Sequence, residues 1–200
     1  MRKYISNFSK KITIALEHLP TAEIAKALNM LEGVYERDGR IYVFGNGCSF
    51  SLATHWVSDF NKTIFSQILE GNTRRFQAIR LPGTEEELTA WANDVGYDLV
   101  FAGPLHNYLQ DSDLIIAISS SGNSENVIQA VQFAKKRRVP VIGISGFDGG
   151  KLNKLADAKI LVKTKIGEYG IVESVHSALL HLMTQYFKDY FTHRNKKANT

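Results

Sequence analysis

Five short apolar segments, separated by stretches with helical periodicity, constrain the fold of this 200-residue chain most strongly. They cover residues 41–44, 77–81, 114–118, 140–145 and 159–162. Short apolar runs that alternate with amphipathic helices are typical of a parallel, doubly wound α/β sheet with helices on both faces. Ligands of such sheets bind beyond the carboxyl ends of the strands, near the point where the strand order reverses. We therefore expect the functional site in the loops that follow the strands.

A loop rich in hydroxyl groups, residues 119–124 (Ser-Ser-Ser-Gly-Asn-Ser), follows the third apolar segment directly, and helical periodicity resumes after it. A helix N-terminus carries unpaired N–H groups and the positive end of the helix dipole, so this loop favours an anion. It has neither the lysine of a Walker A motif nor the pattern G-x-G-x-x-G. We therefore interpret it as a site for the single phosphate of a small molecule. The alternative is that Asn123 or Ser124 only caps the helix, but the loop has more polar residues than a cap requires.

The first apolar segment leads into a similar turn, Gly45-Asn46-Gly47-Cys48-Ser49, and then into a helix predicted over about residues 50–61. On this helix His55 and Asp59 are four residues apart, so their side chains are neighbours. The pair suits two ligands of one metal ion, or a general base beside an orienting group. An ordinary His–Asp pair on the surface has the same spacing, and the pair alone favours that alternative.

A second group of titratable residues, Glu173, His176 and His181, lies on the last predicted helix, residues 171–190. Glu173 and His181 are eight residues apart, which is about 12 Å along a continuous helix. A zinc ion ~2 Å from each donor atom would bridge them only under strain. The helix must bend near Glu173, or neighbouring subunits must contribute, if both residues belong to one metal site. The alternative is that His181 lies on a polar stripe of the helix.

Length and composition indicate one globular domain with a formal net charge of +4. Residues 1–36 form a pair of predicted helices that we expect to take part in oligomerisation, and residues 190–200 are predicted to form a flexible tail. The single cysteine fits a reducing compartment, and the N-terminus has no long apolar segment, so we expect a cytoplasmic protein without a signal peptide or membrane span. The basic cluster at 135–138 ends a helix and contains no stacking aromatic residues, so we expect no nucleic-acid partner.

These motifs together resemble the sugar isomerase (SIS) domain family, and within it they are most similar to the bacterial phosphoheptose (sedoheptulose 7-phosphate) isomerases. The matching motifs are residues 45–49, His55 with Asp59, residues 93–97 (Asn-Asp-Val-Gly-Tyr), residues 119–124, and Glu173, His176 and His181. The likeness extends over nearly the whole chain, including the two N-terminal helices.

The resemblance implies one SIS domain over residues 1–200, folded as a flavodoxin-like three-layer α/β/α sandwich with a five-stranded parallel sheet. It also implies a homotetramer with active sites between subunits. The implied reaction is aldose–ketose isomerisation of a phosphosugar through an enediol. Sedoheptulose 7-phosphate would be converted to a heptose 7-phosphate during the synthesis of a surface glycan.

The family's functional residues match several positions of this sequence. By resemblance, the substrate and its phosphate contact Asn46, Ser49, Asp94, Ser119, Ser120, Ser121, Ser124 and Glu173. A zinc ion is implied at His55, Asp59, Glu173 and His181. Asp59 is the implied base and His181 the implied acid, although a carboxylate bound tightly to zinc is a poorer base.

Some positions depart from the family pattern. Cys48 stands where the family usually has glycine, Asp59 where it has glutamate, and Glu173 where it has glutamine. Aspartate is one methylene shorter than glutamate, and Glu173 adds a negative charge that favours a bound cation. The alternative function is a non-catalytic tetrameric adaptor that resembles the replication-initiator-associating branch of the family. The acidic and histidine residues at all four metal positions argue against it.

Overall fold

A computed structural model describes residues 1–65 and 74–198. Its centre is one parallel sheet of five strands, each at a predicted position, and the strand order is β2-β1-β3-β4-β5. The strands are β1 (Arg40–Gly45), β2 (Gln77–Arg80), β3 (Leu114–Ser119), β4 (Val141–Phe147) and β5 (Ala158–Lys163). This order is flavodoxin-like, and it reverses between β1 and β3. The predicted fold class is therefore confirmed.

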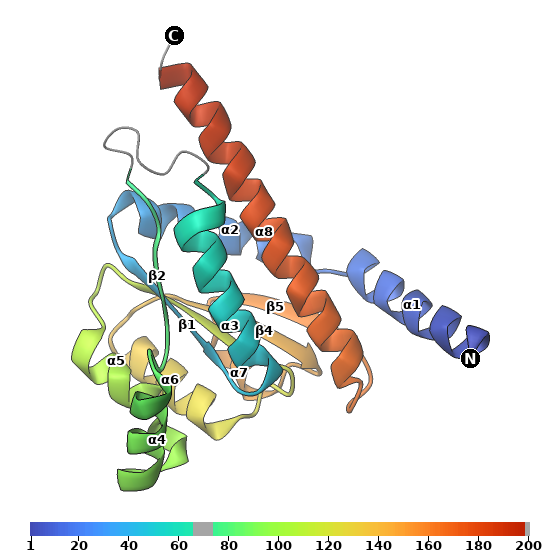
Figure 1. Ribbon diagram of the computed structural model, residues 1–200, viewed down its shortest axis with the longest axis horizontal. Helices are drawn as coiled ribbons and strands as arrows, with labels where there is room; N and C mark the ends of the chain where they lie inside the picture. Colours follow the sequence, from blue (N-terminus) through green and yellow to red (C-terminus); the bar gives the residue numbers. More distant parts are fainter. Residues whose placement is uncertain (66–73, 199–200) are drawn as a thin grey trace.

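Helices cover both faces of the sheet, so the domain has three layers (Figure 1). One face packs against α2 (Thr21–Glu36), α3 (Cys48–Ser58) and α8 (Tyr169–Ala198). The other face packs against α5 (Ala102–Tyr108), α6 (Glu125–Lys136) and α7 (Gly150–Leu155), and α4 (Glu85–Asp94) lies at its margin. Alternate strand residues face the two layers: Ile41 and Val43 belong to one core cluster, and Tyr42 and Phe44 to the other. Burial on both faces explains why the strands are continuous apolar runs in the sequence.

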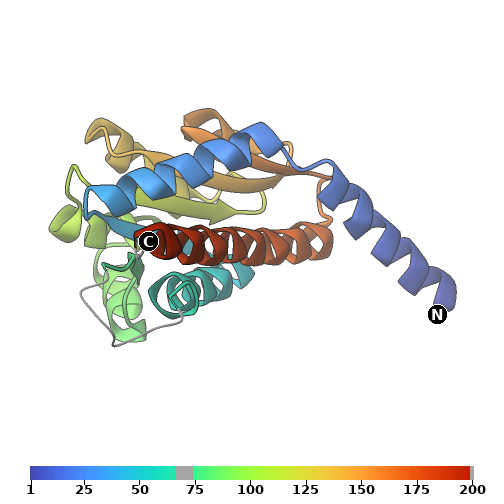
Figure 2. The same cartoon turned by 90° about the horizontal axis from the view of Figure 1, so that it is seen from above.

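Helix α1 (Arg2–Glu17) extends away from the rest of the domain, as Figures 1 and 2 both show. Ala15 is its only buried residue, whereas Tyr4, Ile5 and Phe8 are exposed. Helix α2, in contrast, buries five residues and covers part of the sheet. A use of residues 1–36 in oligomerisation stays a prediction. The exposed apolar side chains of α1 are what such a contact requires.

Helix α8 is longer than the sequence pattern predicted. It continues to Ala198 instead of ending near Tyr190, so residues 190–198 are helical, and residues 199–200 of the predicted tail lie outside the described part of the chain. Two features explain the extra turns. Residues 171–198 contain no glycine or proline. Phe191 is buried, with its ring centroid 4.6 Å from that of Tyr35, so tertiary packing continues past the predicted end.

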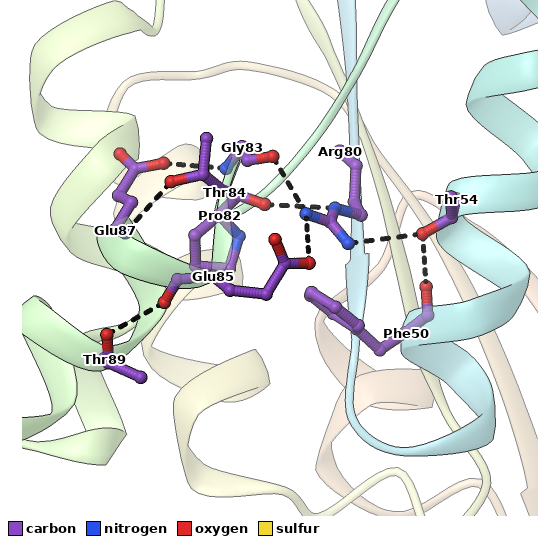
Figure 3. Close-up of polar contacts among 9 residues, drawn as sticks. All are labelled: Phe50, Thr54, Arg80, Pro82, Gly83, Thr84, Glu85, Glu87 and Thr89. Atoms are coloured by element: carbon purple, nitrogen blue, oxygen red, sulfur yellow. Dashed lines mark hydrogen bonds and ion pairs between the residues drawn. The ribbon is translucent and has the colours of Figure 1, made fainter.

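Arg80, at the end of β2, joins the sheet edge to α3 (Figure 3). Its Nε donates to the carbonyl of Pro82 (3.1 Å) and its Nη2 to the carbonyl of Gly83 (2.8 Å). The guanidinium carbon lies 4.3 Å from the centroid of the Phe50 ring, on the first turns of α3. These contacts fix the start of α3 relative to β2.

His176 anchors α8 to the sheet. Its imidazole is buried, and Nε2 lies 3.2 Å from the carbonyl oxygen of Ser145 in β4. Because a carbonyl accepts, Nε2 carries the proton of the neutral ring. Burial lowers the pKa of His176 to about 4, against a small opposing effect of the Ser145 carbonyl. The helix is therefore docked through an uncharged histidine.

This docking makes stability depend on pH. In the unfolded chain His176 takes up a proton near pH 6.5, whereas in the folded chain it does so only near pH 4. Its contribution is therefore complete above pH 6.5 and is lost as the pH falls to 4, by about 3 kcal/mol. Denaturant titrations of the wild type and of His176→Gln, at pH 7 and pH 4, measure this difference. Equal pH dependence of the two proteins would contradict the prediction.

Candidate active site

Two polar loops lie side by side at the point where the strand order reverses. β1 and β3 are neighbours, and Gly45 pairs with Ile118 at their carboxyl ends. A Cβ atom on Gly45 would lie 2.5 Å from the carbonyl oxygen of Ile118 and 2.6 Å from Cβ of Ser49, so only glycine allows this approach. The turn 45–49 and the loop 119–124 therefore meet where ligands of doubly wound sheets bind.

The serine loop brings hydroxyl groups to the N-terminus of α6 at this point. Ser119 and Ser120 are buried, and the Oγ atoms of Ser119 and Ser124 are 3.1 Å apart. Ser124 occupies the N-cap position of α6, but its side chain makes no capping hydrogen bond. The interpretation as a simple cap is therefore wrong. The backbone N–H of Val127 donates to Oδ1 of Asn126 (2.9 Å), so the first turn of α6 is partly capped from within. Anion binding at this helix N-terminus stays a prediction, which the helix dipole and the serine hydroxyls support.

Not every serine of the loop is equally available. Ser121 Oγ accepts from the backbone N–H of Asn123 (3.2 Å), and the Asn123 amide donates to the Ser121 carbonyl (3.0 Å). Ser121 thus helps to form the turn. Gly122, at φ +64°, is needed there because a Cβ would lie 2.0 Å from the carbonyl oxygen of Gly149. Ser49 is buried in the first turn of α3, next to the loop.

Asn46 connects the two loops through a pair of amide hydrogen bonds that the sequence did not reveal. Its Nδ2 donates to Oδ1 of Asn126 (2.9 Å), and the Asn126 Nδ2 donates back to Asn46 Oδ1 (2.9 Å). The Tyr97 hydroxyl also donates to Asn46 Oδ1 (2.9 Å), which brings the turn 95–97 against the site. Asp94 precedes this turn, is exposed, and accepts from the Asn93 amide (2.8 Å). The contacts of buried Asn126 and exposed Tyr97 with Asn46 were missed because these residues are distant in sequence.

A cluster of three metal-binding side chains lies between α3 and α8, which run side by side in both views of the domain (Figures 1 and 2). One donor atom each of His55, Asp59 and His181 lies within 4.8 Å of the others. His55 Nε2 is 3.8 Å from Asp59 Oδ2, and the His55 and His181 rings are 5.1 Å apart at their centroids. The His55–Asp59 pair is therefore more than an ordinary surface pair, because a third donor from another helix joins it.

Asp59 is buried, and a second helix holds its carboxylate. Thr184 of α8, itself buried, donates from Oγ1 to Asp59 Oδ2 (3.1 Å). At Asp59 the chain passes from α3 into a π-helical turn, Asp59–Thr63. Turns of this kind are rare and often occur at functional sites. Neither feature can be read from the sequence pattern.

The three donors fit a zinc ion. Ligand atoms around zinc at ~2 Å lie within about 4 Å of one another, so small side-chain rotations bring this cluster to bonding distance. Two imidazoles and one carboxylate are also a donor set that zinc accepts, with a position left for water or substrate. The structure thus provides a His/Asp/His triad able to hold a metal ion.

Glu173 does not join the triad within one chain. Helix α8 is continuous from Tyr169, so the bend considered for Glu173 is not present, and the residue stays about two turns from His181. Its carboxylate lies beside the thiol of Cys48, at the start of α3. Removal from water raises the pKa of the Cys48 thiol, and the adjacent Glu173 carboxylate raises it further. Two positions that depart from the family pattern therefore meet next to Ser49.

Comparison with known proteins agrees with this geometry. Residues 3–146 match the SIS domain family. The chain belongs to this family.

A phosphoheptose isomerase of Chlorobium phaeobacteroides is 31% identical over 182 residues, which cover 90% of this chain and 79% of that protein. A phosphoheptose isomerase of Helicobacter pylori is 30% identical over 172 residues, 86% of each chain. The solved structure of a phosphoheptose isomerase from Neisseria gonorrhoeae superposes with a TM-score of 0.81, at 26% identity, and covers 94% of this SIS-domain chain and 98% of the other. The resemblance predicted from the motifs is confirmed.

We expect Thr184→Val to weaken metal binding at the triad of this SIS-domain protein. Valine keeps the shape of the side chain but removes the donor that orients Asp59, and such supporting contacts are worth about 10–100-fold in metal affinity. Titration with Zn²⁺ measures the effect. Thr192→Val is a matched control, because Thr192 lies on the exposed side of the same helix and donates only to the Lys188 carbonyl. Equal affinities of the two variants would contradict an orienting role of Thr184.

We also expect Glu173→Gln to make Cys48 more reactive. The neutral amide removes a charge that raises the pKa of the thiol, so a larger fraction is thiolate at neutral pH. The rate of alkylation by iodoacetamide reports Cys48 alone, because the chain has one cysteine. Glu125→Gln, on the first turn of α6, controls for a general change of charge. An unchanged rate in Glu173→Gln would show that the two side chains do not interact in solution.

Proposed function

We propose that the protein is an aldose–ketose isomerase of a phosphosugar, and that its substrate is sedoheptulose 7-phosphate in the biosynthesis of a surface heptose. The observation that carries this proposal is the combination of two sites, one beside the start of α3 and the other between α3 and α8. A neutral serine loop suited to a phosphate lies at one end, and the His55/Asp59/His181 triad lies farther along. The curated relatives named above are phosphoheptose isomerases and cover most of the chain.

The separation of the two sites supports a long sugar. Ser49 and His55 are six residues apart on α3, or about 9 Å along the helix axis, and Glu173 and His181 are about 12 Å apart on α8. An extended seven-carbon sugar with single bonds of about 1.5 Å measures roughly 9 Å from its carbonyl carbon to its phosphorus. With its phosphate in the serine loop, its carbonyl end reaches the triad. A triose phosphate in the same position would be too short.

The residues at the triad supply the proton transfers. Asp59 removes the proton from the carbon next to the carbonyl, and His181 donates a proton to the carbonyl oxygen, which gives the enediol. Reversal of these transfers on the neighbouring atoms completes the isomerisation. A zinc ion held by His55, Asp59 and His181 would stabilise negative charge that develops on the sugar oxygens. Thr184 and His55 keep the Asp59 carboxylate in place during these steps.

The proposal includes zinc as the metal, a homotetramer as the assembly and the cytoplasm as the location. In a tetramer with intersubunit sites, Glu173 of a neighbouring chain is free to approach the triad, which its own helix prevents. The exposed apolar face of α1 supports contacts between copies. A single cysteine fits a reducing compartment. Among the described residues, no helix has the length and apolar character needed to cross a bilayer.

Incubation with sedoheptulose 7-phosphate, with and without Zn²⁺, tests the proposal, and NMR of the sugar phosphates detects a heptose 7-phosphate. We expect turnover that Asp59→Asn and His181→Gln each reduce by about 100-fold or more, because each removes a proton-transfer group. Ser119→Ala combined with Ser124→Ala should instead raise KM, since these hydroxyls would bind the phosphate and not the reacting carbons.

Thr192→Val, on the exposed side of α8, should leave both constants unchanged. Formation of no heptose phosphate in either condition would contradict the proposal and favour the non-catalytic adaptor. Activity that survives Asp59→Asn would contradict the assignment of the base.

A further inference from the structure

Asn61 makes two side-chain hydrogen bonds that nothing in the proposed reaction requires. It lies in the π-helical turn Asp59–Thr63, two residues after Asp59. Its Nδ2 donates to the carbonyl of Ala78 (2.8 Å), and its Oδ1 accepts from the backbone N–H of the same residue (2.8 Å). The amide therefore binds both backbone groups of one strand residue, as a neighbouring strand would.

The strand it binds is an edge of the sheet. β2 is the first strand in the order β2-β1-β3-β4-β5, and it pairs with β1 only. Ala78 directs its N–H and C=O away from β1, toward Asn61. Unpaired edge groups are a liability that proteins cover. Here one side chain covers them and at the same time ties the turn after α3 to the sheet.

The tied turn has an unfavourable backbone. The N–H of Ile64 donates to the carbonyl of Asp59 (3.1 Å), a spacing of five residues instead of four. A π turn is rare because the α-helix is more favourable, so contacts outside the helix must maintain it. Asn61 lies inside this turn and provides two of them. Loss of Asn61 leaves the backbone free to return to α-helical spacing, which would rotate the residues at the turn.

Asp59 and Phe60 depend on the geometry of this turn. The Asp59 carboxylate accepts from Thr184, and the buried Phe60 ring packs against Phe187, one turn farther along α8, at a centroid distance of 6.5 Å. Consecutive residues thus both face α8. A return to α-helical spacing would disturb this arrangement and move the Asp59 carboxylate away from His55 and His181.

We propose that Asn61 is a positioning residue for Asp59: by binding the edge of β2 it maintains the π turn that holds this carboxylate in the triad. The expected effect on kcat rests on the proposed function, whereas the role of Asn61 in maintaining the π turn does not. It assigns the edge of β2 a role in the site, although β2 contributes no residue to the triad. Arg80 makes a second contact between β2 and α3, because its guanidinium lies over the Phe50 ring in the first turns of α3 (Figure 3).

Two variants test the proposal. Asn61→Ala removes both hydrogen bonds, and Asn61→Asp keeps the size of the side chain but places a carboxylate oxygen against the Ala78 carbonyl. Gln77→Ala is the matched control, because Gln77 lies on the same edge strand and its side chain donates only to Asp38 at the surface. Zn²⁺ affinity, steady-state constants and hydrogen exchange of the Ile64 amide are measured for each protein.

We expect both Asn61 variants to bind Zn²⁺ about tenfold more weakly and to have a lower kcat at nearly unchanged KM, since the serine loop is distant. The Ile64 amide should exchange faster in both variants, and the Gln77 control should match the wild type in every measurement. Unchanged affinity, kcat and exchange in Asn61→Asp would overturn the proposal. Equal losses of Zn²⁺ affinity, kcat and amide protection in Gln77→Ala would also overturn it, because they would show a general loss of stability.

The outcomes also separate this inference from the proposed function. A wild-type protein that neither binds Zn²⁺ nor isomerises a heptose phosphate would refute the proposed function. Exchange of the Ile64 amide would then decide alone whether Asn61 maintains the turn. Faster exchange in the Asn61 variants would support the positioning role, and unchanged exchange would overturn it.

Discussion

The close approach of β1 and β3 at their carboxyl ends is the constraint on which the site depends. The strand order reverses there, so the chain leaves both strands through loops that no crossover helix covers. Gly45 allows the turn after β1 to reach the Ile118 carbonyl, and Asn46 and Asn126 then join the two loops through their amides. A polar cluster with fixed donors therefore results from the backbone topology. The serines only supply its chemistry.

The pairing of α3 with α8 adds a second end to the site, where the triad His55, Asp59 and His181 lies. Each helix begins near the polar cluster and contributes to the triad about two to three turns later, so the spacing between the ends is set by helix geometry. Side-chain contacts with α8 then orient the residues at the triad: Thr184 donates to the Asp59 carboxylate, and the Phe187 ring packs against that of Phe60. Long packed helices make this spacing rigid, which suits a site that must hold a substrate at two points.

The sequence predicted the parts of the molecule that depend on local patterns. Short apolar runs predicted all five strands, and the hydroxyl-rich loop stands at a helix start as expected, while its use as an anion site stays a prediction. Features that depend on distant partners were not accessible. The amide clamp of Asn61 on Ala78 and the pair Asn46–Asn126 join residues that are 17 and 80 positions apart, and no local pattern records them. The end of α8 was placed too early for the same reason: burial of Phe191 depends on Tyr35, which lies on α2. The π turn at Asp59 is local, but the apolar pattern of the sequence does not distinguish it from an α-helix.

The distribution of charge between the two ends has a consequence for the orientation of a substrate. In the metal-free protein, the buried Asp59 carboxylate repels the negative charge of a phosphate, and the neutral donors and helix dipole of the serine loop attract it. We therefore expect a phosphosugar to enter the metal-free protein with its phosphate toward the serine loop, whereas a zinc ion at the triad would reverse the sign of the charge there. Neutral donors at the loop also avoid the strong hold that lysine or arginine would exert, which favours release of a product that carries the same phosphate as the substrate. Glu173 and Cys48, which differ from the family pattern, meet at the serine-loop end beside Ser49, and we expect them to affect which sugars the site accepts.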